Sequence, residues 1–184
     1  VSTGLPGING GDGPISIEGR DYGDARTKPF AYDVTASASY FETFRLSALK
    51  GRLLDSRDTA ESLKTVVINE AMAKEMWPDG SPIGARVRFD FEEEDGWRTI
   101  VGIVPDLVHD NDGKIDPTVY TPTTQSPERF MSIGVRGEGD PRALVGAIRT
   151  ALAQTDPDLA LYWVRTLDEY RANVTAGFRI VGSM

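Results

Sequence analysis

The sequence predicts an α+β fold for this chain of 184 residues. Three segments support the prediction: a β-branched run followed by a helix at 66–76, two strand-like runs around an acidic turn at 86–104, and a β-α-β pattern after residue 117. Such a mixture of consecutive strands and alternating strands and helices is typical of a mixed sheet with helices packed against it. With 40% hydrophobic residues, the chain can bury the core of one domain or of two small lobes that share it.

The N-terminal quarter predicts short strands around one short helix. Residues 1–13 are rich in glycine and are expected to be irregular. After them we expect two strands, a helix that Ser39 is placed to cap, and a third strand. These elements are Pro14–Glu18, Phe30–Ala36, a helix ending at Phe44, and Leu46–Leu49.

The clearest local unit is a strand, a helix and a turn between residues 66 and 84. Val66–Ile68 suits a buried strand, and Asn69 can cap the following helix because its side chain accepts a hydrogen bond from an orphan backbone N–H. Trp77-Pro78 ends that helix, since proline has no N–H and disfavours the α conformation in the residue before it. We expect Gly84 to adopt a positive φ in the turn, where a Cβ atom would clash.

A hairpin is predicted next, with the arms Arg86–Phe91 and Trp97–Val104. The residues between the arms are mostly carboxylates and are interpreted as a solvated hairpin tip. All three tryptophans lie beside apolar elements, so we expect each of them to pack in the core. They are Trp77, Trp97 and Trp163.

The last third predicts a β-α-β unit around one long helix, Pro141–Gln154. Asp140 is placed as the N-cap and Pro141 as the first helical residue. The apolar residues of the helix recur at the spacing of one face, which we expect to pack on a small sheet through a right-handed crossover. They are Leu144, Val145, Ile148 and Leu152. The flanking strands are expected at Thr118–Thr121, Met131–Arg136 and Leu161–Val164, and Thr166 is placed to cap a last short helix.

Charge and composition exclude several classes of function. The formal net charge is −8, whereas nucleic acid and anionic lipid both select a basic face. Cysteine is absent, which excludes disulfides, thiolate catalysis and cysteine-ligated zinc. No apolar run reaches the roughly 18 to 20 residues that span a bilayer. The N-terminus lacks the charged and apolar regions of a signal peptide.

Candidate metal ligands are sparse. His109 is the only histidine, and we expect it to be exposed in a polar loop. The run Asp110–Gly113 looks like part of a calcium loop, but valines would occupy the first and twelfth ligand positions, so an EF-hand is excluded. A cation held by neighbouring carboxylates remains an alternative to a solvated loop. Those carboxylates are Asp106, Asp110, Asp112 and Asp116.

We predict no catalytic, cofactor-binding or metal-binding residues, no cofactor and no enzyme activity. Gly137-Glu138-Gly139 precedes a helix, but Arg142 stands at the third glycine position of a dinucleotide fingerprint and Glu138 would repel pyrophosphate. The sequence has neither a nucleophile elbow nor a phosphate-binding loop, and a Ser-His-Asp triad would depend on the lone His109. An acid/base pair among the many carboxylates and an unrecognised hydrolase site remain alternatives.

Several motifs follow one another in a fixed order. The longest is Asn-Glu-Ala-x-Ala followed by Trp-Pro-x-Gly-x-Pro-Ile-Gly, from Asn69 to Gly84. The others are Tyr40–Thr43, Leu49–Arg52 with Asp58, Ile100–Asp106, Val119–Pro122 and Asp156–Ala160. Over roughly Leu5–Leu167, this set closely resembles the periplasmic core domain of MacB-type and FtsX-like transporter permeases. The duplicated orphan permeases of that superfamily look nearest.

The resemblance implies a single extracytoplasmic domain, 1–184, with two lobes. A porter-like lobe of β-α-β units would comprise about 1–50 and 117–172, and a mixed α/β lobe would be inserted at about 51–116. Family members usually carry a strand and a helix before the start seen here, so that unit is expected to precede this segment. The domain would lie in the periplasm, on the outer face of the bacterial cytoplasmic membrane, between transmembrane helices outside this sequence.

Two functions of different classes follow from the resemblance. In the leading one, the domain is not an enzyme and transmits ATP-driven movement to substrate or partner proteins in export or efflux, by rocking as a rigid body on its transmembrane helices. Its partners would be those helices, a cytoplasmic ATPase subunit or domain, and a periplasmic adaptor protein, and both ends of the segment would face the membrane. The alternative is a ligand- or peptide-binding domain that captures cargo in the cleft between the lobes.

Overall fold

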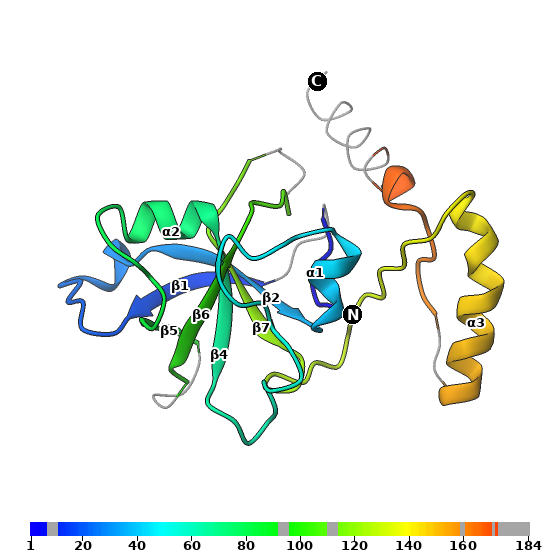
Figure 1. The fold of residues 1–184 in the computed structure, drawn as a ribbon, viewed down its shortest axis with the longest axis horizontal. Coiled ribbons are helices and arrows are strands. Elements are labelled where there is room, and N and C mark those ends of the chain that lie inside the picture. Colours follow the sequence, from blue (N-terminus) through cyan, green and yellow to red (C-terminus); the bar gives the residue numbers. More distant parts are fainter. Residues whose placement is uncertain (7–10, 92–95, 110–113, 159–160, 171, 173–184) are drawn as a thin grey trace. The chain divides into compact units, whose positions relative to one another are not determined.

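The computed structural model describes residues 1–6, 11–91, 96–109, 114–158, 161–170 and 172. The chain divides into two compact units, Val1–Gly134 and Val135–Met184. The strands that the structure describes all belong to the first unit, and the helix α3 belongs to the second (Figure 1).

The first unit is built on one mixed sheet. Its strands are β1 (Gly11–Ile17), β2 (Phe30–Ala36), β3 (Lys50–Gly51), β4 (Thr65–Asn69), β5 (Arg86–Phe89), β6 (Arg98–Val104) and β7 (Thr118–Pro122). Within the described residues they follow the order β3-β6-β4-β7-β2-β1-β5. Because β6 also pairs with β5, six strands close into a barrel and β3 extends the sheet beside β6. The pairs β2–β7 and β4–β6 are parallel, and the other pairs are antiparallel.

The main core fills the barrel and is closed by a helix. Met72 and Met76 project from α2 (Glu70–Met76) into the same cluster as the inward side chains of the strands. Those side chains are Ile15, Ile17, Ala31, Val66, Ile68, Val87, Phe89, Ile100, Ile103 and Val119. Alternation along each strand places these residues on one face, as the burial of apolar surface requires.

Asn69 caps α2 as predicted and also ties the helix to β7. Its side-chain oxygen accepts a hydrogen bond from the backbone N–H of Met72 at 3.1 Å and from that of Thr118 at 2.9 Å. Its amide nitrogen donates to the carbonyl of Asp116 at 2.9 Å. A fully buried amide is tolerated here because both of its ends are hydrogen-bonded.

A second core cluster lies on the outer face of β2, β4 and β7, under the short helix α1 (Ser39–Thr43). Tyr40 and Phe41 of α1 pack around Tyr120, with ring centroids 5.7 and 5.4 Å from the Tyr120 ring. Both β4 and β7 are therefore buried on their two faces, which explains their unbroken apolar runs.

The α+β class is confirmed, and three local expectations are corrected. Leu46–Leu49 is not a strand, because the chain pairs with β6 only at Lys50–Gly51. Ser39 is the first residue of α1 and does not cap it. Gly84 has the expected positive φ of +89°, but no atom lies within 4 Å of its Cβ position. The backbone conformation, not a clash, therefore requires glycine there.

Strands from both predicted lobes take part in the barrel. β1, β2 and β7 come from the segments assigned to the porter-like lobe, and β4, β5 and β6 come from the segment assigned to the inserted lobe. The lobe boundaries themselves stay a prediction.

The second unit contains the predicted long helix. Asp140 caps it through a hydrogen bond from the backbone N–H of Arg142 at 2.9 Å, and a 3-10 turn, Pro141–Ala143, leads into α3 (Leu144–Thr155). The apolar face is only half-buried, however, and no residue of α3 is fully buried. The helix and its cap are confirmed, whereas the expected close packing of Ile148 on a sheet is not observed.

Two predicted strands are absent from the described residues. Met131–Arg136 is irregular apart from an isolated bridge between Ser132 and Ser2, and Leu161–Val164 forms no strand. Trp163 is 85% exposed, so its assignment to the core is wrong. No helix in the described parts of the chain is long and apolar enough to cross a membrane. Met184, which we expected on the same side of the fold as Val1, lies outside those parts.

Thr166 caps the last short helix as predicted. Its hydroxyl accepts a hydrogen bond from the backbone N–H of Glu169 at 3.1 Å, and the Glu169 carboxylate accepts one from the backbone N–H of Thr166 at 2.9 Å. This reciprocal pair is a capping box for the helical residues 167–170.

Candidate functional site

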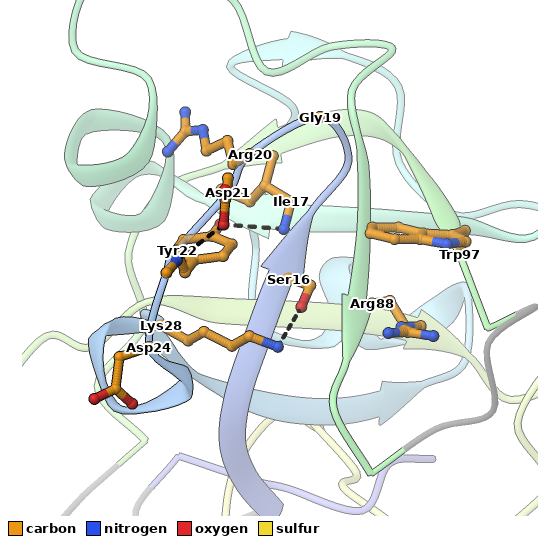
Figure 2. Close-up of a pocket in the computed structure, with 11 residues that line it drawn as sticks. Ser16, Ile17, Gly19, Arg20, Asp21, Tyr22, Asp24, Lys28, Arg88 and Trp97 are labelled. Atoms are coloured by element: carbon orange, nitrogen blue, oxygen red, sulfur yellow. Dashed lines mark hydrogen bonds between the residues drawn. The ribbon is translucent and has the colours of Figure 1, made fainter.

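An open pocket of about 370 Å³ lies on the outer surface of the barrel beside β1 and β5 (Figure 2). These strands pair antiparallel, with Ser16 opposite Arg88. Neighbouring residues in a strand point to opposite faces, so Ile17 enters the core while Ser16 and Arg88 point outward. The segment that connects β1 to β2 forms the facing wall.

An ion pair stabilises the β1 side of the pocket. Lys28 Nζ donates to Asp90 Oδ2 at 2.8 Å and to Ser16 Oγ at 3.0 Å, and Ser16 Oγ donates to Asp90 Oδ1 at 2.8 Å. Burial raises the pKa of Asp90, but the hydrogen bonds from Lys28 and Ser16 outweigh it, so the pKa lies below its ordinary value. The carboxylate is ionised at neutral pH, and its lowered pKa makes it a weak base toward the Ser16 hydroxyl, so Ser16 is not activated as a nucleophile.

The facing wall is held to the core and to the end of α2. Tyr22 OH accepts a hydrogen bond from the backbone N–H of Ile17 at 3.2 Å. Arg20 donates to the carbonyl of Met76, and its guanidinium carbon lies 5.2 Å from the centroid of the Trp77 ring. The wall is therefore fixed at two points, one on β1 and one where α2 ends.

Trp97 lines the third side of the pocket, and two arginine side chains lie over its ring. The guanidinium carbons of Arg86 and Arg88 lie 5.9 and 5.1 Å from the centroid of its ring, within the range of a cation–π interaction. Arg86 also donates to the carboxylate of Glu18 at 2.7 Å. Trp97 is half-buried and belongs to neither core cluster, so the expectation that it packs in the core is corrected.

The lining of the pocket mixes charged and aromatic residues. Arg20, Lys28 and Arg88 are among them, but the Arg20 and Arg88 guanidinium groups point to opposite sides (Figure 2). The lining residues contain no histidine and no cysteine. Lys28 and Arg88 already act on the carboxylate of Asp90, and the lining offers no group poised to move a proton at neutral pH.

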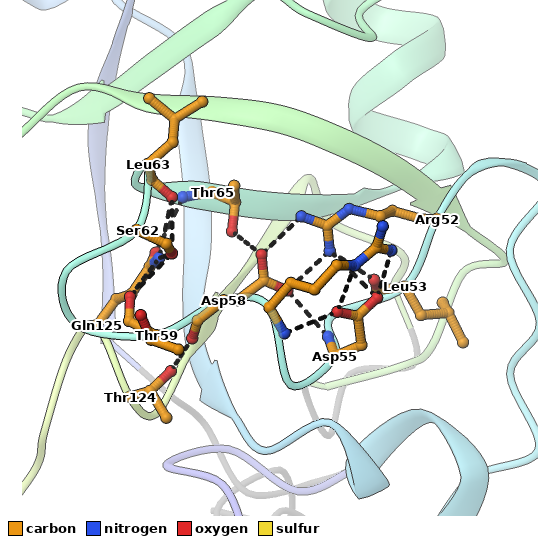
Figure 3. A network of polar contacts seen from close by, with 11 residues as sticks. Arg52, Leu53, Asp55, Asp58, Thr59, Ser62, Leu63, Thr65, Thr124 and Gln125 are labelled. Carbon is orange, nitrogen blue, oxygen red and sulfur yellow. Dashed lines mark hydrogen bonds and ion pairs between the residues drawn. The ribbon is translucent and has the colours of Figure 1, made fainter.

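A second polar cluster holds the segment between β3 and β4 against the barrel (Figure 3). Asp58 is 3% exposed, and its carboxylate accepts from Arg52 at 2.6 and 2.8 Å, from Thr65 Oγ1 at 2.8 Å and from the backbone N–H of Asp55 at 2.9 Å. Burial raises the pKa of Asp58, but these hydrogen bonds and the charge of Arg52 lower it by more. The pKa therefore lies below its ordinary value. The buried charge is thus fully paired.

Two side chains that follow β7 hold the same segment from the other side. Gln125 Nε2 donates to the carbonyls of Thr59 at 3.1 Å and Leu63 at 3.0 Å, and Thr124 donates to the carbonyl of Asp58. Because these bonds end on backbone carbonyls, they fix the path of the segment and leave no reactive group exposed. We assign this cluster a structural role.

His109 is buried, which corrects the expectation of an exposed loop residue. It is 3% exposed, and its Nε2 atom lies 2.9 Å from the hydroxyl of the fully buried Tyr120. Burial lowers the pKa of His109 to about 4, so the ring is neutral at neutral pH. Its Nδ1 atom has no hydrogen-bond partner among the described residues. Tyr120 belongs to the second core cluster. Among the described residues, the pair of His109 and Tyr120 has no metal-binding or catalytic partner.

The carboxylates of the candidate cation loop are only partly described. Asp106 Oδ1 accepts a hydrogen bond from the backbone N–H of Ala71 at 2.8 Å, so this carboxylate supports the N-terminus of α2. Asp110 and Asp112 lie outside the described residues, so the alternative of a bound cation is not tested. Among the residues that are described, no group of three or more His, Cys, Asp or Glu side chains could hold a metal ion.

No recognisable motif marks the pocket in the sequence. The one usable signal is the alternation Arg86-Val87-Arg88, which places both guanidinium groups on the same face of a strand. Their meeting with Trp97 depends on the hairpin, and the place of Arg88 opposite Ser16 depends on the pairing of β1 with β5. The sequence analysis therefore missed the pocket.

Comparisons with known proteins agree with the fold. Residues 9–151 match the sequence profile of the MacB-like periplasmic core domain. A comparison with curated proteins finds no match. Among solved structures, the chain is similar to the periplasmic region of MacB from Actinobacillus actinomycetemcomitans, with a TM-score of 0.55 and 17% identity over 84% of this chain and 65% of that chain.

A second solved structure shares the same architecture. The extracellular domain of the noncanonic ABC-type transporter YknZ from Gram-positive bacteria has a TM-score of 0.54 and 14% identity, over 84% of this chain and 80% of that chain. At such identities the likeness establishes the fold. The chain spans 65% of the length of the MacB region that it matches.

Proposed function

The chain belongs to the family of MacB-like periplasmic core domains, non-catalytic domains of ABC-type transporter permeases, and we propose that it transmits ATP-driven movement to proteins outside the membrane. A domain with this role needs stiffness and a surface for partners more than it needs a reactive site. Export or efflux is the process that such movement would serve.

The closed sheet is the observation that supports the proposal most directly. β6 pairs with β4 on one side and with β5 and β3 on the other, so the ring of strands has no open end at this point. The Arg52–Asp58 cluster then fixes the connection from β3 to β4 against the barrel wall. A closed, cross-tied barrel moves as one body because bending it would break many hydrogen bonds at once.

The proposal includes the setting in which the barrel moves. The domain would stand in the periplasm on transmembrane helices of its parent permease, driven by a cytoplasmic ATPase subunit or domain, with a periplasmic adaptor as a further partner. The porter-like lobe, about 1–50 with 117–172, would receive the movement first, and the inserted lobe, about 51–116, would carry it outward. The chain's compact units, Val1–Gly134 and Val135–Met184, have a different boundary, so the division into these lobes is part of the proposal.

Capture of cargo in a cleft between the lobes is the alternative function. The pocket described above joins residues 16–28 of the predicted porter-like lobe to Arg88 and Trp97 of the predicted inserted lobe, but it is open, whereas a ligand site encloses most of its ligand.

The experiment that tests the proposal measures distances in the parent permease in liposomes. This segment has no cysteine, so once any cysteines elsewhere in the permease are replaced by serine, Ser56→Cys and Asp79→Cys place two labels at exposed positions of the barrel unit. We expect the distance between these labels to stay constant, and the distance from Asp79 to the bilayer surface to change when ATP is added.

The matched control is a permease whose ATPase binds ATP without hydrolysing it. In this control the distance from Asp79 to the bilayer surface should not alternate between its values with and without ATP. A barrel that stays at one height through the hydrolysis cycle would refute the proposal. A change between the two barrel labels would refute movement as a rigid body.

A further inference from the structure

The unit Val135–Met184 has polar contacts where the barrel has a core. None of its described residues is buried, so the burial of apolar side chains fixes its elements less firmly than it fixes the strands of the barrel. A side-chain bond between residues far apart in the sequence therefore has more influence here on how the elements lie against one another.

Glu169 makes such a bond, because it uses both oxygens of its carboxylate. Oε2 accepts the hydrogen bond from the backbone N–H of Thr166 that completes the capping box of the helix 167–170. Oε1 accepts a hydrogen bond from Arg142 Nη2, and the two side chains form an ion pair. Arg142 belongs to the 3-10 turn that leads into α3. One carboxylate thus joins two elements across 27 positions of the sequence.

We propose that Glu169 couples the helix 167–170 to α3, so that a movement of this helix is passed to α3 and is not absorbed between the two elements. The inference deepens the proposed function and rests on it, because coupling matters only if ATP-driven movement enters this unit. It names the contact through which the movement would pass.

Both ends of the contact are held in place by their own elements. The Asp140 side chain accepts a hydrogen bond from the backbone N–H of Arg142 at 2.9 Å, which fixes the start of the turn. At the other end, Thr166 Oγ1 accepts one from the backbone N–H of Glu169 at 3.1 Å, and the carbonyl of Thr166 accepts one from the backbone N–H of Tyr170 at 3.0 Å. A displacement of either end therefore acts on a whole turn of helix.

The contact requires the carboxylate of a glutamate. The side chain of glutamine has a single acceptor oxygen, so it could keep the cap or the bond from Arg142 in their present geometry, but not both. The pKa of Glu169 lies below its ordinary value, because the backbone N–H of Thr166 and the Arg142 guanidinium favour the ionised form. An exposed ion pair contributes little to stability, so its effect should appear in the relative position of the two elements.

The test measures distances within this unit in the parent permease in liposomes. With cysteines elsewhere in the permease replaced by serine, Ala151→Cys in α3 and Ala172→Cys in the last helix carry spin labels at exposed positions. We expect one narrow distribution of distances between these labels, with and without ATP. We also expect both labels to change their distance from the bilayer surface when ATP is added.

Arg142→Gln removes the ion pair and leaves the capping box intact. In this variant the narrow distribution should be lost, and the Ala151 label should respond to ATP less than the Ala172 label does. Glu169→Gln approaches the contact from its other side and should give the same loss. Arg149→Gln is the matched control, since it removes the same charge from an exposed arginine of α3 outside the contact, and it should keep the narrow distribution.

The proposal is overturned if Arg142→Gln and Glu169→Gln keep the narrow distribution through the ATP cycle, or if Arg149→Gln loses it as they do. It is also overturned if the Ala151 label responds to ATP in Arg142→Gln as fully as in the unchanged permease. Failure of the proposed function gives a different result: neither label would change its distance from the bilayer in the unchanged permease. The distance between the labels would still decide whether Glu169 couples the two elements.

Discussion

Two buried polar residues show opposite solutions to the same problem. Removing a charge from water is costly, so a buried group must either be paired or give up its charge. Asp58 keeps its charge, because Arg52 and Thr65 surround it with donors. His109 has only the hydroxyl of Tyr120 within reach of its Nε2 atom, and burial keeps the ring neutral.

The His109 ring should make the stability of the chain depend on pH. Its pKa is lowered from 6.5 to about 4 in the folded state, so the unfolded chain binds more protons between these values. Stability should be unaffected by this residue above pH 6.5 and should fall by about 3 kcal/mol as the pH drops toward 4, at 1.36 kcal/mol for each pKa unit.

Urea unfolding of the wild-type chain and of His109→Gln at several pH values checks this expectation. Glutamine cannot be protonated, yet its amide can still bond to Tyr120, so the variant removes the titration and keeps the polar contact. The difference in unfolding free energy between the two chains should narrow as the pH falls. A constant difference from pH 7 to pH 4.5 would show that the ring is accessible to protons in the folded state.

Asp58→Asn should destabilise the chain by about 2 kcal/mol or more, because it leaves the Arg52 guanidinium facing an amide. The lowered pKa of Asp58 means that this stabilisation is present above about pH 4, the ordinary value for a carboxyl, and is lost as the pH falls through the folded pKa. Thermal unfolding at pH 7 measures the effect. Asp55→Asn is the control, since the ion pairs of Asp55 with Arg57 and, at 3.6 Å, with Arg52 lie near the surface and should contribute little. Equal losses in both variants would contradict the structural role of the Arg52–Asp58 pair.

At the scale of elements, β6 is the strand on which barrel closure depends. Its first residues pair with β5 and its last residues with β3, while its other edge pairs with β4 along its length. Gly102 lies where β6 crosses the chain that leaves β3. A Cβ atom at this position would be 1.9 Å from the carbonyl oxygen of Arg52.

Gly102→Ala should therefore cost about 3 kcal/mol or more, because the obstructing atom belongs to the backbone and β6 cannot move without breaking its pairs. Thermal unfolding measures the loss. Gly146→Ala in α3 makes the same chemical change where no atom lies within 4 Å, and it should stabilise the helix by about 0.5 to 1 kcal/mol. A small effect of Gly102→Ala would mean that the two strands can separate locally.

Elements with local signals were predicted well. The Asn69 cap, the end of α2 at Trp77 and the Asp140 cap all depend on residues within one helical turn. Closure of the barrel was not predictable, because β1 pairs with β5 across a long stretch of chain that carries no mark of the pairing. The same holds for the pocket: Arg88 and Trp97 meet within the predicted hairpin, but the wall that faces them depends on the pairing of β1 with β5. The spacing of apolar residues in α3 predicted the helix, but it does not indicate which surface would cover the apolar face.

At the scale of the whole molecule, the two core clusters lie within one part of the chain. The buried hydrophobic residues that the structure describes run from Ile15 to Tyr120, and all of them belong to the unit Val1–Gly134. None of the described residues after Gly134 is buried. The free energy that holds the barrel together should therefore come from this unit alone.

The fragment 1–134 should accordingly fold without the rest of the chain. We expect it to unfold cooperatively, with a melting temperature within about 5 °C of that of the full chain, because almost no apolar burial is lost. The comparison fragment, 1–104, lacks β7, which lies between β4 and β2 and closes the ring.

Without β7, two strands would expose their edges, and Val67 and Val34 would lose Tyr120 from their cluster, so the comparison fragment should not unfold as a cooperative unit. Circular dichroism melts of the two fragments and of the full chain give the result. If 1–134 proved unfolded, residues 135–184 would be required by the barrel, and the division into two units would not describe its folding. A cooperative transition in 1–104 would instead show that ring closure is dispensable, which would remove the physical basis for a barrel that moves as one rigid body.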